Sequence, residues 1–151
     1  MFTNFSFSSF LQSKKMKRSS LRPIVYIAGP FAGDVLENTN KAIKVGNLAH
    51  RTGLGSIVPH PMILSEVYGK DEIPQEREDG CISTLSIVGQ IAKIESSFIW
   101  IIEKEDKSLS LGTKNELDLW LAIRKDLGYP YHVFRKTYKE WIEYENSLNL
   151  R

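Results

Sequence analysis

Short apolar runs alternate along this chain with longer stretches in which apolar residues recur at helical spacing. Four runs are short enough to be strands: residues 23–28, 56–58, 98–102 and 131–134. Four stretches have the helical spacing: residues 34–53, 74–94, 110–127 and 138–148. This alternation predicts a doubly wound α/β fold of the Rossmann or flavodoxin type, with a mainly parallel sheet of four to five strands flanked by helices.

The run Phe98–Ile102 is apolar at every position, which predicts a central strand covered on both faces. In an open parallel sheet, ligands bind beyond the carboxyl ends of the strands. The turn at residues 29–34 and the Pro59-His60-Pro61 loop each follow a predicted strand, so both are expected at such a crevice. Gly29 and Gly33 would let backbone amides of the first turn approach a ligand closely.

A glycine-containing turn, residues 110–116, leads from the central strand into the next helix and ends on a carboxylate, Glu116. Glu116 is four residues before Trp120, so it falls on the apolar stripe of that helix, where a carboxylate is costly unless something requires it. We expect the helix N-terminus to favour its ionised form, which a nucleophile needs. The alternative is a capping box in which Glu116 bonds back to Thr113, and the three-residue spacing fits this equally well.

Two further residues allow both a functional and a structural interpretation. His60 either contacts substrate or carries a proton, or it is a loop histidine fixed by hydrogen bonds. Arg77 either holds a neighbouring acid or a ligand phosphate, or it belongs to a solvated, charged helix start.

Composition places the chain among single globular domains, with 151 residues of which 42% are hydrophobic and 25% charged. Residues 1–22 carry five basic residues and no acidic one, so we interpret them as a disordered or targeting leader and residues 23–151 as one α/β domain. The expected location is the cytoplasm, or a mitochondrion or other organelle if the leader is a targeting segment. The single cysteine, Cys81, excludes an internal disulfide and is expected to be buried.

Several classes of partner are not expected. No apolar run approaches the roughly 18 residues of a membrane span, and no basic stripe interleaved with aromatics indicates nucleic-acid binding. No histidines, cysteines or carboxylates stand at metal-ligand spacing, so neither a metal site nor a cofactor is predicted.

Three motifs together resemble those of the nucleoside 2-deoxyribosyltransferase superfamily, which includes the 2'-deoxynucleoside 5'-phosphate N-hydrolases. They are Tyr26-Ile27-Ala28-Gly29-Pro30-Phe31, Pro59-His60 and Ser110-x-Gly112-Thr113-x-x-Glu116, and the similarity covers about residues 23–135. The resemblance implies that Glu116 attacks the anomeric carbon and displaces the base, and that a second base or water resolves the glycosyl-enzyme. It also implies a homodimer, a nucleoside or nucleotide substrate, and a sugar 5' end or phosphate held by Ser110 and Gly112. The other candidate substrate-binding residues are Tyr26, Gly29, Pro30, Phe31, Asp34, Asn38, His60, Arg77 and Thr113.

The sequence departs from that superfamily at one position. Where the family has an aspartate that helps the base to leave, this chain has Gly89-Gln90, and the candidate substitutes are Glu78, Asp79, Glu95 and Asp34. Two other functions stay open. One is a phosphoribohydrolase resembling the cytokinin-activating type, which also has a Gly-Thr-x-x-Glu turn at a helix start, and the other is a non-catalytic nucleotide-binding or sensing module.

Overall fold

The computed structural model describes the backbone of residues 21–64 and 74–150, and the side chains of residues 21–62 and 81–150. Its elements in chain order are β1 (Ile24–Ala28), α2 (Val35–Arg51), β2 (Gly55–Ile57), α3 (His60–Leu64), α4 (Pro74–Ala92), β3 (Phe98–Glu103), α5 (Leu111–Leu127), β4 (Val133–Thr137) and α6 (Tyr138–Ser147).

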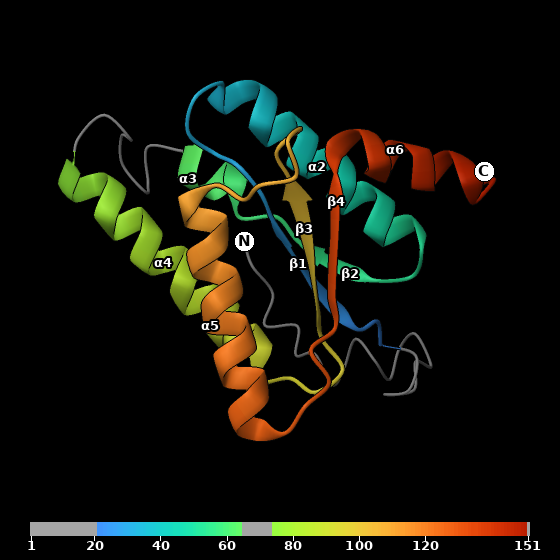
Figure 1. Cartoon of the computed structure of the whole chain (residues 1–151). Helices are drawn as coiled ribbons and strands as arrows, with labels where there is room; N and C mark the ends of the chain where they lie inside the picture. The colour runs from blue at the N-terminus through green and yellow to red at the C-terminus, as the bar shows by residue number, and fades with distance from the viewer. Residues whose placement is uncertain (1–20, 65–73, 151) are drawn as a thin grey trace, which may run out of the picture.

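The four described strands form one parallel sheet in the order β2-β1-β3-β4. Helices cover both of its faces, with α2 and α6 on one side and α4 and α5 on the other (Figure 1). The predicted doubly wound α/β fold is therefore confirmed. The central position predicted for residues 98–102 is confirmed too, because β3 lies between β1 and β4.

Alternate residues of each strand face different helices, which divides the core in two. Val25 and Ile27 of β1 pack with the α2 and α6 side, whereas Tyr26 and Ala28 pack with the α4 and α5 side. Tyr26 thus lies on the face covered by α5, the helix that carries Glu116.

Trp141 fixes α6 to the sheet. Its ring stacks on Trp100 of β3 with 4.5 Å between ring centroids, and its Nε1–H donates to the Ile101 carbonyl at 3.0 Å. The side chain is fully buried, so α6 is a part of the core layer rather than an appendage.

Arg124 ties the elements together at the edge of the sheet where the strands begin. This fully buried guanidinium group donates to Ile94 O at 2.6 Å, Glu95 O at 2.8 Å and Pro130 O at 2.8 Å. It thereby joins the end of α4, the body of α5 and the turn before β4. Burial lowers the pKa of Arg124, but these carbonyls compensate the charge.

Three local expectations are wrong. Residues 59–61 are not a loop throughout, because α3 begins at His60. The last strand begins at Val133 rather than at Tyr131, because His132 has a φ of 50° and breaks the extended run. Cys81 is exposed, although a buried thiol was expected. Among the described residues, no helix is both long and apolar enough to cross a bilayer.

Candidate functional site

The turn after β1 is held in shape by its own neighbours. The Asn38 amide nitrogen Nδ2 donates to Phe31 O at 3.3 Å and to Ala32 O at 3.1 Å. The Asp34 side chain caps α2 by accepting the Glu37 N–H at 3.1 Å. These two side chains, predicted as substrate contacts, therefore have a structural task in folding the turn.

Packing leaves little room for a side chain at the start of this turn. A Cβ atom on Gly29 would lie 3.1 Å from the Cβ of Ile102, tighter than ordinary van der Waals contact. Gly33 needs glycine for a different reason, its φ of +94°. The predicted close approach of backbone amides to a ligand stays a prediction.

His60 holds the same turn through contacts with two of its backbone carbonyl groups. Its Nε2 lies 3.2 Å from Gly29 O and 3.1 Å from Pro30 O, which requires the tautomer that carries its proton on Nε2. The ring is buried, which lowers its pKa, and its centroid is 6.1 Å from that of Phe31. The observed geometry matches the interpretation of a histidine fixed by hydrogen bonds, while its Nδ1 is buried without a partner among the described residues.

The start of α5 differs from the capping box considered from the sequence. Ser110 is the N-cap residue: its Oγ accepts the Thr113 N–H at 3.3 Å and lies 2.7 Å from Thr113 Oγ1. Thr113 thus occupies the third helical position and Glu116 lies one turn further along. The capping-box alternative for Glu116 is therefore wrong, and its carboxylate is not used to cap the helix.

Glu116 lies on the core side of α5 beside Tyr26. The residue is only 9% exposed and Tyr26 is fully buried. The Tyr26 hydroxyl is near enough to lower the pKa of Glu116, yet neither Tyr26 Oη nor Glu116 Oε2 reaches hydrogen-bond geometry with a described residue. This pair joins β1 to α5 and leaves two polar atoms without partners in the interior.

Burial decides the charge of Glu116. It raises the pKa of this carboxyl group to about 7, and the nearby Tyr26 hydroxyl only partly opposes the increase. Burial and the Glu116 charge together raise the pKa of Tyr26 well above its ordinary value. Burial thus opposes the ionised form of Glu116, and the expected effect of the helix N-terminus on that form stays a prediction.

A cleft of about 570 Å³ lies on the opposite, α2 and α6, side of the sheet ends. We call it the α2–α6 cleft, and its lining consists of Pro30, Asn38, Lys41, Ile102, Glu103, Lys104, Glu105, Thr137, Tyr138 and Lys139. Of the residues predicted from the sequence, Pro30 and Asn38 line it. Tyr26 and Glu116 do not, so the candidate nucleophile and this cleft are separate features.

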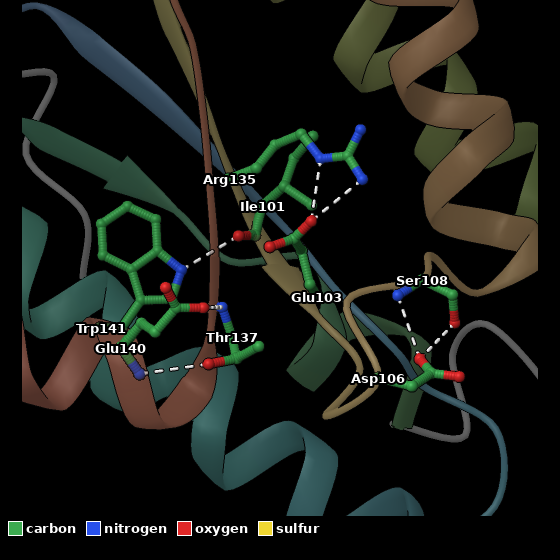
Figure 2. A network of polar contacts seen from close by, with 8 residues as sticks. All are labelled: Ile101, Glu103, Asp106, Ser108, Arg135, Thr137, Glu140 and Trp141. Carbon is green, nitrogen blue, oxygen red and sulfur yellow. Dashed lines mark hydrogen bonds and ion pairs between the residues drawn. The ribbon is translucent and has the colours of Figure 1, made fainter.

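Polar contacts fix the walls of the cleft. Figure 2 shows Glu103 Oε2 directed toward Arg135, 3.1 Å from Nε and 3.0 Å from Nη2, and Asp106 Oδ1 accepting both the N–H and the hydroxyl of Ser108. The Lys104 N–H also donates to Ser108 O at 2.9 Å. The exit loop of β3 is therefore a closed turn that holds Lys104 at the cleft.

The sequence-predicted residues thus fall into three groups. Six gather at the first turn, namely Gly29, Pro30, Phe31, Asp34, Asn38 and His60; two form the Tyr26–Glu116 pair; and three, Ser110, Gly112 and Thr113, form the start of α5. Arg77 belongs to α4, but its side chain lies outside the described part. Sequence reasoning missed Lys41, Lys104, Tyr138 and Lys139, which line the cleft. Only their position in the sequence could have indicated them, because each lies in a loop or helix that follows a strand.

The structure also places two of the four candidates for the acid that helps a base to leave, Glu95 and Asp34. Glu95 follows α4 and precedes β3, so it lies at the amino edge of the sheet, opposite the loops of the candidate site. It is therefore excluded from that role. The side chain of Asp34 caps α2, and those of Glu78 and Asp79 lie outside the described part. Within the described residues, no three His, Cys, Asp or Glu side chains gather as they would around a metal ion.

Comparison with protein families gives one match, to a domain of unknown function named DUF7768, over residues 23–127. The chain belongs to the DUF7768 family. The matched part of this DUF7768 protein runs from just before β1 to the end of α5, so it contains the first turn, His60 and the Tyr26–Glu116 pair. Neither the curated proteins nor the solved structures contain a match to the chain.

Proposed function

We propose that this protein cleaves or transfers at the N-glycosidic bond of a nucleoside, a deoxynucleoside or a 5'-monophosphate of either, with Glu116 as the nucleophile. The observation that carries the proposal is the Glu116 carboxylate, 9% exposed, with one oxygen unpartnered among the described residues. A protein retains such a costly group when its chemistry needs it.

The reaction has two displacements at the anomeric carbon. In the first, a Glu116 oxygen bonds to that carbon while the carbon–nitrogen bond breaks, and the base leaves with the electron pair and takes up a proton from the solvent. In the second, water or another base attacks the same carbon and gives up a proton to the solvent, while the ester bond to Glu116 breaks and restores the carboxylate. A carboxylate suits both steps, because the transition states resemble an oxocarbenium ion. The Tyr26 hydroxyl lies beside Glu116, and a hydrogen bond formed between them during the reaction would orient the carboxylate between the two steps.

The pKa of about 7 gives the proposal a defined pH dependence. A nucleophile acts as the carboxylate, so only the deprotonated fraction of Glu116 reacts. Turnover should therefore rise with pH through about 7 and level off above it, provided that the substrate does not titrate in that range.

The test is a base-release assay with ribonucleosides, deoxynucleosides and the 5'-monophosphates of both, followed by chromatography of the free base. Glu116→Gln should reduce release at least about a thousandfold, because the amide cannot form the glycosyl ester. Asp118→Asn is the matched control, since Asp118 is an exposed carboxylate on the same helix, and it should leave the rate unchanged.

Other outcomes identify the competing functions. Release from ribonucleoside monophosphates alone would indicate a phosphoribohydrolase. Binding of monophosphates without release of base from any of the compounds would contradict the enzyme proposal and favour a sensing module. If Glu116→Gln kept full activity, the assignment of the nucleophile would be wrong.

A further inference from the structure

We propose that the α2–α6 cleft is a second ligand site, which binds a phosphate monoester whose organic part presents the apolar face of a ring. The inference goes beyond the proposed function, because neither Tyr26 nor Glu116 lines this cleft. Four features of the cleft carry it: its place in the sheet, its charge, a backbone donor at the start of α6 and its apolar wall.

The first feature is the position of the cleft. Pro30 follows β1, Ile102 is near the end of β3, and Thr137 ends β4, so the cleft opens where three neighbouring parallel strands finish. Between β1 and β3 the order of the sheet changes direction, since β2 lies beyond β1 and β4 beyond β3. Parallel sheets bind ligands at such a switch point, and about 570 Å³ is an ordinary volume for a small-molecule site.

The second feature is a convergence of lysines from three segments. Lys41 comes from α2, Lys104 from the exit loop of β3 and Lys139 from the first turn of α6. Lys41 is already paired with Glu37 at 3.0 Å, and Lys139 reaches Glu143 only at 4.0 Å, between two exposed side chains. Lys104 has no ion pair with a described side chain, so two ammonium groups are available to an anion.

The acids of the cleft do not cancel this charge. Glu103 is held by Arg135 through two nitrogen atoms, at 3.1 Å and 3.0 Å from Oε2 (Figure 2). Glu105 is the remaining acid in the lining, against Lys104 and Lys139. The lining as a whole has three lysines, Lys41, Lys104 and Lys139, against two glutamates, Glu103 and Glu105, so its formal net charge is 3 − 2 = +1.

The third feature is a backbone donor at the start of α6. The capping box of α6 uses the N–H groups of Thr137 and Glu140, at 3.1 Å and 3.2 Å from their acceptors. No described residue accepts the N–H group of Lys139, which lies in the first turn of the helix. This amide, next to lysine ammonium groups, favours an oxyanion with several acceptor oxygens, as a phosphate has.

The fourth feature is an apolar wall beside the charged groups. Pro30, Ile102 and the ring of Tyr138 supply it, and the Lys41 ammonium group lies 5.4 Å from the centroid of the Tyr138 ring and holds that ring in place. Inorganic phosphate would leave this wall uncovered. An ester whose organic part presents the apolar face of a ring would cover it, and burial of that surface would add affinity.

The test is titration calorimetry with four probes: inorganic phosphate, ribose 5-phosphate, a nucleoside 5'-monophosphate and the corresponding nucleoside. We expect the monophosphate to bind, inorganic phosphate and the sugar phosphate to bind more weakly, and the nucleoside not to bind at this site. The affinity of the monophosphate should fall with ionic strength, because partly exposed charges are screened.

Paired variants assign the binding to the cleft. The double variant Lys104→Ala/Lys139→Ala should weaken binding of the monophosphate at least about tenfold. The matched control is Lys44→Ala/Lys125→Ala, which removes the same charge from exposed lysines outside the cleft and should leave the affinity unchanged. Glu116→Gln alters the other proposed site, so it reports any binding of the monophosphate there.

Two results would overturn the inference. One is binding that is lost equally in both lysine pairs, which would indicate a general charge effect. The other is binding that is lost in Glu116→Gln but kept in the cleft variant, which places the phosphate ester at Glu116 and leaves only the proposed function standing. Failure of base release, conversely, would remove the proposed function without affecting binding in the cleft.

Discussion

The carboxyl group of Glu116 is costly to ionise where it lies. Its pKa is about 7 in the folded protein against 4.5 for an exposed glutamate, so between these values the folded state holds more protons than the unfolded state. The free energy of unfolding must therefore fall as pH rises across this window, by about 3 kcal/mol in total. This sign is the opposite of the usual one for a salt-bridged acid.

Replacement of Glu116 by glutamine should remove this cost. At pH 8 we expect Glu116→Gln to be more stable than the wild type by about 3 kcal/mol, and at pH 5 by less than about 1 kcal/mol, because the wild-type carboxyl is then mostly protonated. Urea unfolding at both pH values measures the difference. A gain of equal size at pH 5 and pH 8 would show that the carboxyl group does not titrate near 7, and Asp118→Asn should show no such dependence.

Two residues, Glu116 and Arg124, show what could not be predicted from the sequence alone. Glu116 stood out because a carboxylate on an apolar stripe is exceptional. A stripe does not reveal how completely a side chain is buried, so the rise in its pKa could not be predicted. Arg124 lies on the same stripe, eight residues after Glu116, and carried the same signal. Its role depends on carbonyl groups from two distant segments, which no local pattern contains.

Helix α5 is the element that presents the candidate site. It begins after the Ser110 cap and ends at Gly128, whose φ of 70° is left-handed. Gly112 lies in its first turn, and a Cβ atom built there meets no atom within 4 Å. The fold itself therefore does not require glycine at this position, and the predicted contact of Gly112 with a ligand stays a prediction.

The variant Gly112→Ala separates folding from binding in α5. The added methyl group should raise stability by up to about 1 kcal/mol, because alanine favours a helix more than glycine does. If a substrate approaches this turn, the same variant should raise its KM several-fold with little change in kcat. Urea unfolding and steady-state kinetics measure the two effects, and an unchanged KM would remove Gly112 from the site.

Arg124 sets the position of α5 against α4. Arg124→Lys keeps the charge but not the fork of donors that reaches Ile94, Glu95 and Pro130, so buried carbonyls lose their partners. We expect a loss of about 2–4 kcal/mol in the free energy of unfolding by urea. The exposed neighbour Lys125 provides the control, and Lys125→Met should change stability by no more than about 0.5 kcal/mol. If Arg124→Lys lost no more than about 0.5 kcal/mol, the charge that lysine retains would be sufficient and the fork of donors would not matter.

At the scale of the whole molecule, α6 completes the layer that forms one wall of the cleft. Trp141→Phe keeps most of the stack on Trp100 but removes the hydrogen bond to Ile101 O, so a loss of about 1–2 kcal/mol is expected in urea unfolding. Tyr131→Phe, at an exposed position, is the control and should have little effect. Equal stability of Trp141→Phe and the wild type would mean that α6 is held by stacking alone.

The sequence predicted the layers of the fold better than its connections. Runs of β-branched and aromatic residues located β1 and β3 closely, because strands buried on both faces are apolar throughout. Helix α3 was missed, since five residues contain too little periodicity to be recognised. The cleft was missed as a unit because its lysines come from three segments that only the folded chain brings together.

The order of the sheet leaves β2 and β4 as the outermost of the described strands. Such strands carry unpaired backbone groups that can template aggregation with another chain. β2 has only three residues, and β4 carries Arg135 and Lys136. A short strand on one side and charged side chains on the other both discourage edge-to-edge pairing of these strands with another chain.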